Sequence, residues 1–407
     1  MEPTTTPINA RFAVLSISAL MATVLNMFAQ TDQAEPPAAS EDPYLWLEDV
    51  DSEDALDWVR ARNAPTLEGL KGSARYEERE HEASRILNAS DRLLFASIRG
   101  EWAYNFWRDE ANPQGLWRRA PLDSYLGGEP AWETLIDLDE LSRQDGRTWV
   151  WKGARFHDDA SKTCLVELSD WGKDAVVIRE FDLETASFVE DGFHLPEAKS
   201  RVAWVNESTI ALATDYGEGS LTESGYARKV KLLARGEAIE EPPVTFEVDP
   251  SHVLAAVSAF RDKGRRMVVF YDVISFFETR KYLLGADRAL VEIPMPTHAV
   301  LEALFDGQLV FRTREDWQTP IGDFKAGSLL SADLDALVQT GRIDRIDTLF
   351  EPTPSQSIES VARTRSSLLV NLNVDVTSEL HCFERTDGAW AGRRADMPEN
   401  GSISLSF

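Results

Sequence analysis

The chain has 407 residues, of which 43% are hydrophobic, and its mean hydropathy of −0.29 is too polar for a protein with many membrane spans. Its 69 acidic and 42 basic residues give a formal net charge of −27. This negative excess argues against a general affinity for nucleic-acid phosphates or anionic lipid. The composition therefore predicts a soluble globular protein without a nucleic-acid partner.

The N-terminus resembles a secretory signal. Residues 12–31 carry no charge, residues 12–25 are dense in apolar side chains, and a lone Arg11 precedes them, an order typical of export signals. An uncleaved membrane anchor is one alternative, because the run approaches the shortest membrane span of about 17 residues; a misassigned start codon is another. We expect residues 1–41 to be a signal-like leader and a disordered linker. They predict a periplasmic or secreted protein, with a cytoplasmic protein as the alternative and stable membrane association only if the leader is uncleaved.

Residues 42–90 form the next predicted segment, which is helical. Asp51 or Ser52 can cap the first amides of a helix, and Leu56 and Val59 give it a short apolar face. The charged helical pattern continues through Leu87. We therefore expect a short helical segment before the main fold.

Strand-like segments then recur at intervals of about 50 residues, the period of propeller blades of four strands each. The first strand of each group begins near Ile98, Trp149, Val202, Val253, Val300, Ile358 and Ile403. A β-sandwich or two stacked all-β domains would also space strands closely, but seven similar repeats favour the propeller. We predict an all-β, seven-bladed β-propeller over residues 91–407, with six blades and only the first strand of a seventh, residues 402–407.

The second group shows the plan within a blade. Its predicted strands are residues 149–152, 163–168, 175–181 and 187–189, separated by turn-type sequences. Residues 181–185 form the predicted turn between its last two strands, and residues 331–334 take the comparable place in the fifth group.

Neither the cysteines nor the histidines form a motif. Cys164 and Cys382 are the only cysteines, so neither a CxxC redox pair nor a four-thiolate zinc site can be built, and a disulfide requires the fold to bring the two together. No metal-ligand spacing relates the six histidines, which are His81, His157, His194, His252, His298 and His381. We assign no metal-binding residue.

Enzyme motifs are also absent from the sequence. It has no GxSxG nucleophile turn, no GxxxxGK[ST] phosphate loop and no GxGxxG after a strand. We therefore assign no catalytic residue and no cofactor-binding residue, and we expect no cofactor.

Aromatic residues gather in the first two groups, where Trp102, Tyr104 and Phe106 alternate as on one face of a strand. The other members are Trp107, Trp117, Trp149 and Trp151. They predict a core between two blades, and a ligand platform is the alternative.

Several short motifs occur along the chain. The first is DPYLWLED at residues 42–49, followed by the capped helix with Trp58, Val59 and Asn63. The others are YNFW at 104–107, GLWRR at 115–119, WETL at 132–135, REFDL at 179–183 and LPEAKS at 195–200. Together they resemble one family of serine peptidases, the prolyl oligopeptidase family, in particular a bacterial branch. The similarity runs from about Asp42 to the last residue.

The resemblance implies a seven-bladed propeller that, in the family, covers an α/β-hydrolase domain with a Ser/Asp/His triad and restricts access to short peptides. Family members cleave after proline or, in some branches, after basic residues. The α/β-hydrolase domain follows the propeller in the family and is absent from this sequence, so no triad residue maps onto it. The resemblance implies a gating propeller that is inactive alone, with an α/β-hydrolase domain in trans and short peptides as partners. The alternative is a free-standing propeller that binds a protein or peptide.

Overall fold

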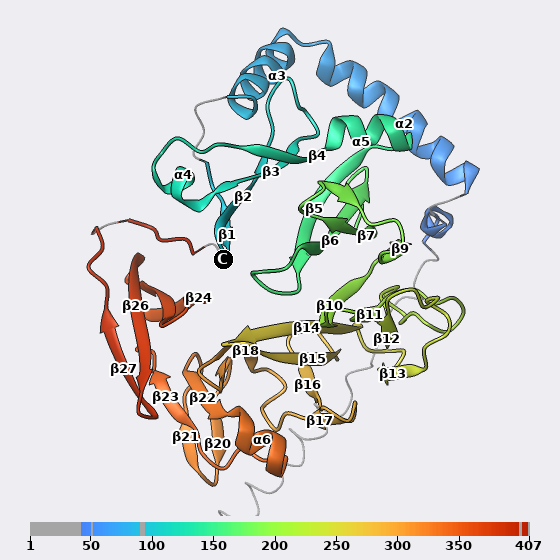
Figure 1. Cartoon of the computed structure of the whole chain (residues 1–407). Coiled ribbons are helices and arrows are strands. Elements are labelled where there is room, and N and C mark those ends of the chain that lie inside the picture. Colours follow the sequence, from blue (N-terminus) through green and yellow to red (C-terminus); the bar gives the residue numbers. More distant parts are fainter. Residues whose placement is uncertain (1–41, 50–51, 90–93, 399–400, 406–407) are drawn as a thin grey trace, which may run out of the picture. The chain divides into compact units, whose positions relative to one another are not determined.

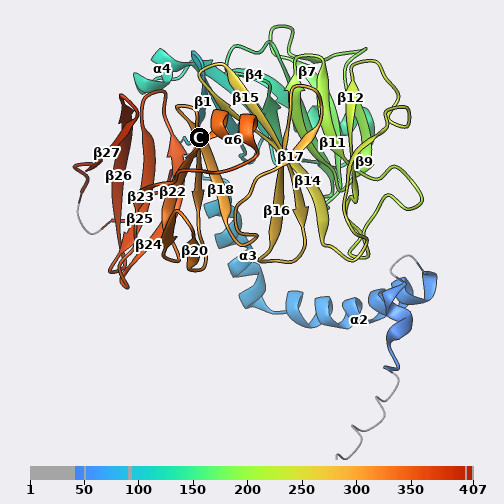
Figure 2. The same ribbon diagram turned by 90° about the horizontal axis from the view of Figure 1, so that it is seen from below.

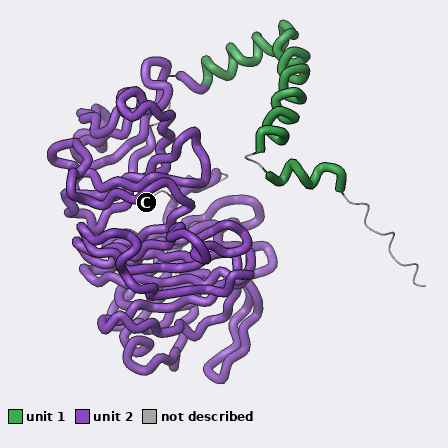
Figure 3. Tube along the Cα trace, turned by 90° about the vertical axis from the view of Figure 1, so that its right-hand side faces the viewer, with its two compact units in different colours: residues 1–86 green, residues 87–407 purple. Residues whose placement is uncertain are grey.

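The computed structural model describes residues 42–49, 52–89, 94–398 and 401–405. It divides the chain into two compact units, residues 1–86 and 87–407, coloured separately in Figure 3. The predicted export signal lies outside the described residues. In the part that is described, no helix is long and apolar enough to cross a membrane.

The first unit is helical. Its elements are the 3₁₀ helix η1 (Leu45–Glu48), α2 (Glu53–Lys71) and α3 (Ala74–Leu87). Ser52 caps α2, since its Oγ accepts a hydrogen bond from the amide of Ala55 at 3.2 Å, so the predicted capping position is confirmed. Ala55 is also the one buried residue of the described helices in this unit, and these helices therefore have no hydrophobic core of their own.

The described part of the second unit contains six antiparallel sheets of four or five strands, numbered sheet 1 to sheet 6 in chain order, and one two-stranded hairpin. Sheet 1 has β1 (Ser97–Arg99), β2 (Trp102–Trp107), β3 (Leu116–Pro121) and β4 (Glu133–Asp137). Sheet 2 has β5 (Trp149–Phe156), β6 (Thr163–Asp170), β7 (Val176–Asp182) and β8 (Ser187–Phe188), and β9 (His194–Ala198) also pairs with β7. Sheet 3 has β10 (Arg201–Asn206), β11 (Thr209–Ala213), β12 (Lys229–Ala234) and β13 (Val244–Glu247).

The other three sheets follow the same plan. Sheet 4 has β14 (Leu254–Asp262), β15 (Arg265–Val273), β16 (Thr279–Leu284) and β17 (Leu290–Glu292). Sheet 5 has β18 (Val300–Phe305), β19 (Gln308–Arg312), β22 (Leu329–Asp333) and β23 (Asp347–Phe350), with the hairpin of β20 (Trp317–Thr319) and β21 (Gly322–Phe324) inserted after β19. Sheet 6 has β24 (Gln356–Arg363), β25 (Leu368–Val374), β26 (Thr377–Thr386) and β27 (Ala389–Arg394).

The first strand of every sheet lies toward a common centre and the last strand lies outside, as Figure 1 shows, which is the arrangement of a β-propeller. Each sheet therefore has two kinds of connection. We call face A the side with the connections between second and third strands, and face B the side with those between first and second and between third and fourth strands. Figure 2 shows β20 at one edge of the ring and α4 (Leu122–Leu126) and α6 (Leu334–Thr340) at the other.

The core lies between the sheets. Five clusters of buried apolar residues each combine side chains of two consecutive sheets. In the cluster of sheets 1 and 2, for example, Trp117 stacks on Trp151 with ring centroids 4.9 Å apart. A sheet with two apolar faces is stable only between neighbours, so the sheets depend on one another.

The predicted repeat is confirmed for the six complete sheets, because their first strands begin within two residues of the predicted starts. The strands of the second group and its turn at 181–185 are also confirmed. The strand predicted at 402–407 is wrong over 402–405, and residues 406–407 lie outside the described residues. Within residues 402–405, polar side chains of sheet 6 bind the main chain of Ile403. The Ile403 N–H donates to Ser378 Oγ at 3.0 Å, and the Ile403 carbonyl accepts from Asn371 Nδ2 at 2.7 Å.

The turn predicted at 331–334 is wrong, because residues 331–333 end the strand β22 and the helix α6 begins at Leu334. Asp333 caps it by accepting the amide of Ala336 at 2.8 Å, and Gly341 ends it at a φ of 68°. Another helix, α5 (Leu138–Asp145), was not predicted, although Asp137 and Gly146 give it the same two signals.

Candidate functional site

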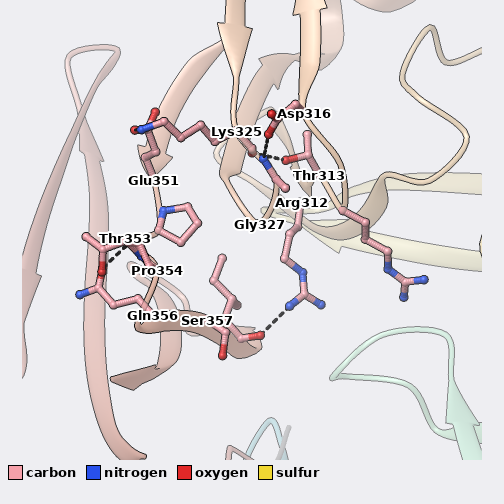
Figure 4. A pocket seen from close by; sticks show the side chains of 14 residues that line it. Arg312, Thr313, Asp316, Lys325, Gly327, Glu351, Thr353, Pro354, Gln356 and Ser357 are labelled. Carbon is pink, nitrogen blue, oxygen red and sulfur yellow. Dashed lines mark hydrogen bonds and ion pairs between the residues drawn. The ribbon is translucent and has the colours of Figure 1, made fainter. Parts of the chain in front are cut away.

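A pocket of about 790 Å³ opens between sheets 5 and 6 (Figure 4). Three segments line it: residues 312–316 at the end of β19, residues 325–327 before β22, and residues 351–358, which cross from sheet 5 into sheet 6. All three belong to connections on face A, so the pocket lies on that face.

Hydrogen bonds join the first two of these segments. Gly327 donates its N–H to the carbonyl of Thr313 at 2.8 Å, and Thr313 Oγ1 donates to the carbonyl of Lys325 at 2.8 Å. Gly327 has a φ of +81°, and a Cβ there would meet Pro352 Cγ at 3.0 Å. Both facts require glycine at this position.

The pocket carries charges of both signs. Arg312 is 3.0 Å from the half-buried Glu302 and donates to the carbonyl of Ile358 at 2.5 Å; Figure 4 shows its side chain pointing toward the segment that carries Ser357. Burial raises the pKa of Glu302, and the adjacent Arg312 opposes that shift. Lys325 pairs with Glu351, and this hydrogen bond raises the pKa of the lysine.

A buried lysine on β16 of sheet 4 interacts with the charge of the pocket residue Arg314. Lys281 is 3% exposed and its Nζ donates to the carbonyl of Thr279 at 2.8 Å. Burial, together with charge repulsion from Arg314 of the pocket, lowers its pKa to about 8. Among the described residues neither cation has a carboxylate partner.

The lining residues suit binding rather than nucleophilic catalysis. They include the hydroxyl groups of Thr313, Thr353 and Ser357 but neither histidine nor cysteine. A serine nucleophile needs an adjacent base to remove its proton, and no lining residue is placed as such a base for Ser357.

Face A also exposes large apolar side chains at the tips of its turns. Phe276 and Phe277, at the tip between β15 and β16, are 89% and 73% exposed. Together with Trp171, Leu221, Ile321 and Val376, which lie in the same connections of sheets 2, 3, 5 and 6, they form what we call the apolar rim. Face B exposes Leu126 and Val338 of the short helices α4 and α6. Because these exposed apolar residues lie on the same face of five sheets, face A is the candidate interaction surface.

One group of potential metal ligands comes from two sheets. Ligand atoms of His157, Asp158 and Glu207 lie within 4.8 Å of one another. Burial lowers the pKa of His157, and so does the positive charge of Arg266, whose guanidinium donates to the main-chain oxygen of His157. A fixed guanidinium beside the group opposes a cation, and we assign no metal to it.

The other histidines and the cysteines lie in separate places. His252 contacts Asp272 at 2.6 Å and His381 contacts Glu379 at 3.0 Å. Cys164 in β6 and Cys382 in β26 are free and buried in different sheets, and burial raises the pKa of the Cys164 thiol. The fold does not bring the two thiols into a disulfide.

The aromatic cluster predicted from the sequence is largely a core. Trp149 and Trp117 are buried between sheets 1 and 2. Trp151 and Phe106, by contrast, are half-buried and stack with ring centroids 5.7 Å apart along a second pocket of about 450 Å³. The sequence pattern marks these residues, but the hollow beside them depends on how two sheets meet.

Comparisons with known proteins identify relatives along nearly the whole chain. A family model described as the prolyl oligopeptidase N-terminal beta-propeller domain matches residues 28–406. An uncharacterized peptidase of Sinorhizobium fredii is 36% identical over 375 residues, which cover 90% of this chain and 52% of the relative. One of Rickettsia prowazekii is 30% identical over 359 residues, covering 85% of this chain and 50% of the relative.

Solved structures of peptidases also resemble this chain. A post-proline cleaving enzyme from Rickettsia typhi is 27% identical with a TM-score of 0.80, over 87% of this chain and 53% of that chain. Oligopeptidase B from Leishmania major, at 15% identity and a TM-score of 0.68 over 88% of this chain and 49% of that chain, supports the fold alone. The chain spans about half the length of the curated relatives it matches.

Proposed function

Because this chain belongs to the prolyl oligopeptidase family, we propose that residues 87–407 are the propeller half of a peptidase that cleaves short peptides. In this proposal face A docks an α/β-hydrolase domain, and the propeller limits which peptides reach the catalytic site. The catalytic triad would come from that domain, outside the described residues, so the described chain alone is inactive. The apolar rim carries the proposal, since it gives face A a hydrophobic contact surface.

The substrate class rests on the relatives. The Rickettsia typhi enzyme is named as post-proline cleaving, and we propose proline-containing short peptides as substrates of the complete assembly. Export to the periplasm stays a prediction, to be tested by N-terminal sequencing of the mature protein.

The docking role can be tested with the full chain and a separately produced α/β-hydrolase domain. The variant Phe276→Ser/Phe277→Ser should weaken association at least tenfold, because it removes two exposed apolar side chains from face A. Leu126→Ser, which removes an exposed leucine from face B, is the control and should bind as the wild type does. Equal binding by all three proteins would refute docking on face A.

The inactivity of the described chain can be tested with a chromogenic proline-containing peptide and a serine-directed probe. We expect neither hydrolysis nor labelling without the hydrolase domain, and hydrolysis once it is added. Turnover by the purified chain alone would show that the proposal is wrong.

A free-standing propeller that binds a protein or peptide is the second candidate, and the pocket of Figure 4 favours it, because a cavity of this size needs no second domain to hold a ligand. The DNA downstream of this coding sequence distinguishes the two. A reading frame encoding GxSxG with a later Asp and His would support the peptidase, and an unrelated gene would support the binding module.

A further inference from the structure

The second pocket, between sheets 1 and 2, is a hollow of about 450 Å³ in an otherwise packed cluster. Its walls include five aromatic side chains, those of Tyr104, Phe106, Trp117, Trp151 and Phe156. This volume is within the range of about 300–1,000 Å³ that is usual for ligand sites, and it has room for a segment of one or two amino-acid residues.

A bulge in β5 opens this hollow. The register with β6 shifts between Trp151 and Gly153, and Gly153 has a φ of +145°, which strongly favours glycine. A Cβ built on Gly153 meets nothing within 4 Å, so the missing side chain leaves open space. Trp151 stacks on Phe106 with the two rings nearly parallel, at an angle of 10°, and both rings line the pocket.

A guanidinium without a carboxylate partner lies at the same pocket. Arg99, at the end of β1, lines it, is half-buried, and has its guanidinium carbon 5.9 Å from the centre of the Phe156 ring. It makes no ion pair with any described residue. Burial lowers its pKa, as do the nearby positive charges of Arg261 and Arg363, whereas the negative charge of Asp159 opposes this shift. A partly desolvated cation among like charges is unfavourable unless an anion joins it.

The acids of the neighbouring turn already have partners. Asp159 is 3.5 Å from Arg261, and its main-chain oxygen packs against Gly100, the residue after Arg99. Asp158 accepts the amide of Ala160 at 2.9 Å and contacts His157 at 3.1 Å. They reduce the local positive charge but leave Arg99 free to pair with another group.

We propose that this pocket binds a peptide segment that carries a carboxylate next to an apolar side chain. The carboxylate pairs with Arg99, and the apolar side chain packs on Phe106 and Trp151. Arg99 supplies two parallel N–H donors, which match a carboxylate. The site belongs to the propeller itself and needs no catalytic domain, so a failure here leaves the proposed docking on face A untouched.

Three tryptophan-free peptides test the proposal by calorimetry and by the tryptophan fluorescence of the full chain. They are N-acetyl-Ala-Leu-Phe with a free carboxylate, the same peptide amidated, and N-acetyl-Ala-Phe-Asp-amide. At least one carboxylate peptide should bind tenfold or more tightly than the amidated one, and which of them does so shows whether the carboxylate is terminal or from a side chain.

Variants connect the binding to the pocket. Arg99→Gln should reduce the tenfold preference for the carboxylate peptide over the amidated one to less than twofold. Trp151→Leu should weaken the binding of all three peptides to the same extent. Arg342→Gln, which removes an exposed arginine outside the pocket, is the control and should bind as the wild type does. Equal binding of acid and amide, no binding of any peptide, or an unchanged preference in a folded Arg99→Gln protein would each overturn the proposal.

Discussion

Trp390 donates its indole N–H to the hydroxyl of Ser331 over 2.9 Å, from the last strand of sheet 6 to the third strand of sheet 5. Ser331 is buried, and the Trp390 ring stacks on Phe305 with centroids 5.7 Å apart. The two sheets are thus joined by a polar contact inside an apolar cluster, and a buried hydrogen bond of this kind also specifies how the sheets pack.

The variant Trp390→Phe tests this contact. It keeps an aromatic ring but leaves the Ser331 hydroxyl unpaired, so we expect a loss of about 1–2 kcal/mol in the free energy of unfolding. Urea unfolding of the full chain measures it. The double variant Trp390→Phe/Ser331→Ala should be only slightly less stable than Trp390→Phe alone, because the hydroxyl has already lost its partner. If the losses in unfolding free energy of the two single variants add up in the double variant, the prediction is wrong.

Glu180 of sheet 2 forms an ion pair with Arg235 of sheet 3, in which the carboxylate is buried and the arginine is partly exposed. The carboxylate is fully buried and also accepts the amide of Phe193 at 3.1 Å. Arg235→Met should destabilise the chain by about 3 kcal/mol, because a buried charge is left without its partner. Arg265→Met breaks an exposed pair with Asp335 between sheets 4 and 5 and should cost less than about 1 kcal/mol. Urea unfolding measures both variants, and equal losses of unfolding free energy in Arg235→Met and Arg265→Met would contradict the prediction.

The stability of the fold should depend on Lys281 at alkaline pH. Its pKa is about 8 in the folded chain against an ordinary 10.5, so between these values the unfolded chain holds a proton that the folded chain has lost. The free energy of unfolding therefore rises with pH across this window.

Lys281→Met removes this dependence. Below pH 8 we expect the variant to be more stable than the wild type by about 2–3 kcal/mol, with the difference shrinking toward pH 10.5. Tyr271, whose pKa burial raises to about 12, is common to both proteins. A difference in unfolding free energy that stays constant from pH 7 to 10 would contradict the prediction.

Amide exchange should separate the helices from the sheets. Ala55 is the single buried residue of α2, and α3 has none, whereas six of the eight residues of β6 are buried. Exchange measured on proteolytic fragments should be orders of magnitude faster in α2 and α3 than in β6. Ser52→Ala removes the cap of α2 and should speed amide exchange further at the start of this helix. If α2 and α3 were as well protected from exchange as β6, the prediction would be wrong.

The repeat could be predicted from the sequence because each sheet begins with a β-branched or aromatic run after a turn. The helix α6 was missed although Asp333 and Gly341 mark its ends, because its seven residues are too short for a periodic pattern to stand out. The pockets could not be predicted at all. Arg312 and Ile358 meet only because sheets 5 and 6 are neighbours, and the hollow near Arg99 depends on a bulge whose position no local motif fixes.

Each cluster of the core combines side chains of two sheets, so a substitution in one sheet changes the packing of its neighbour. A larger side chain in one sheet must be met by a smaller one in the next, since packed interiors tolerate changes best when their total volume is kept. Positions that face each other across a cluster, such as Phe305 and Trp390, are therefore expected to vary together among relatives. We therefore expect substitutions in neighbouring sheets to be correlated with one another rather than independent.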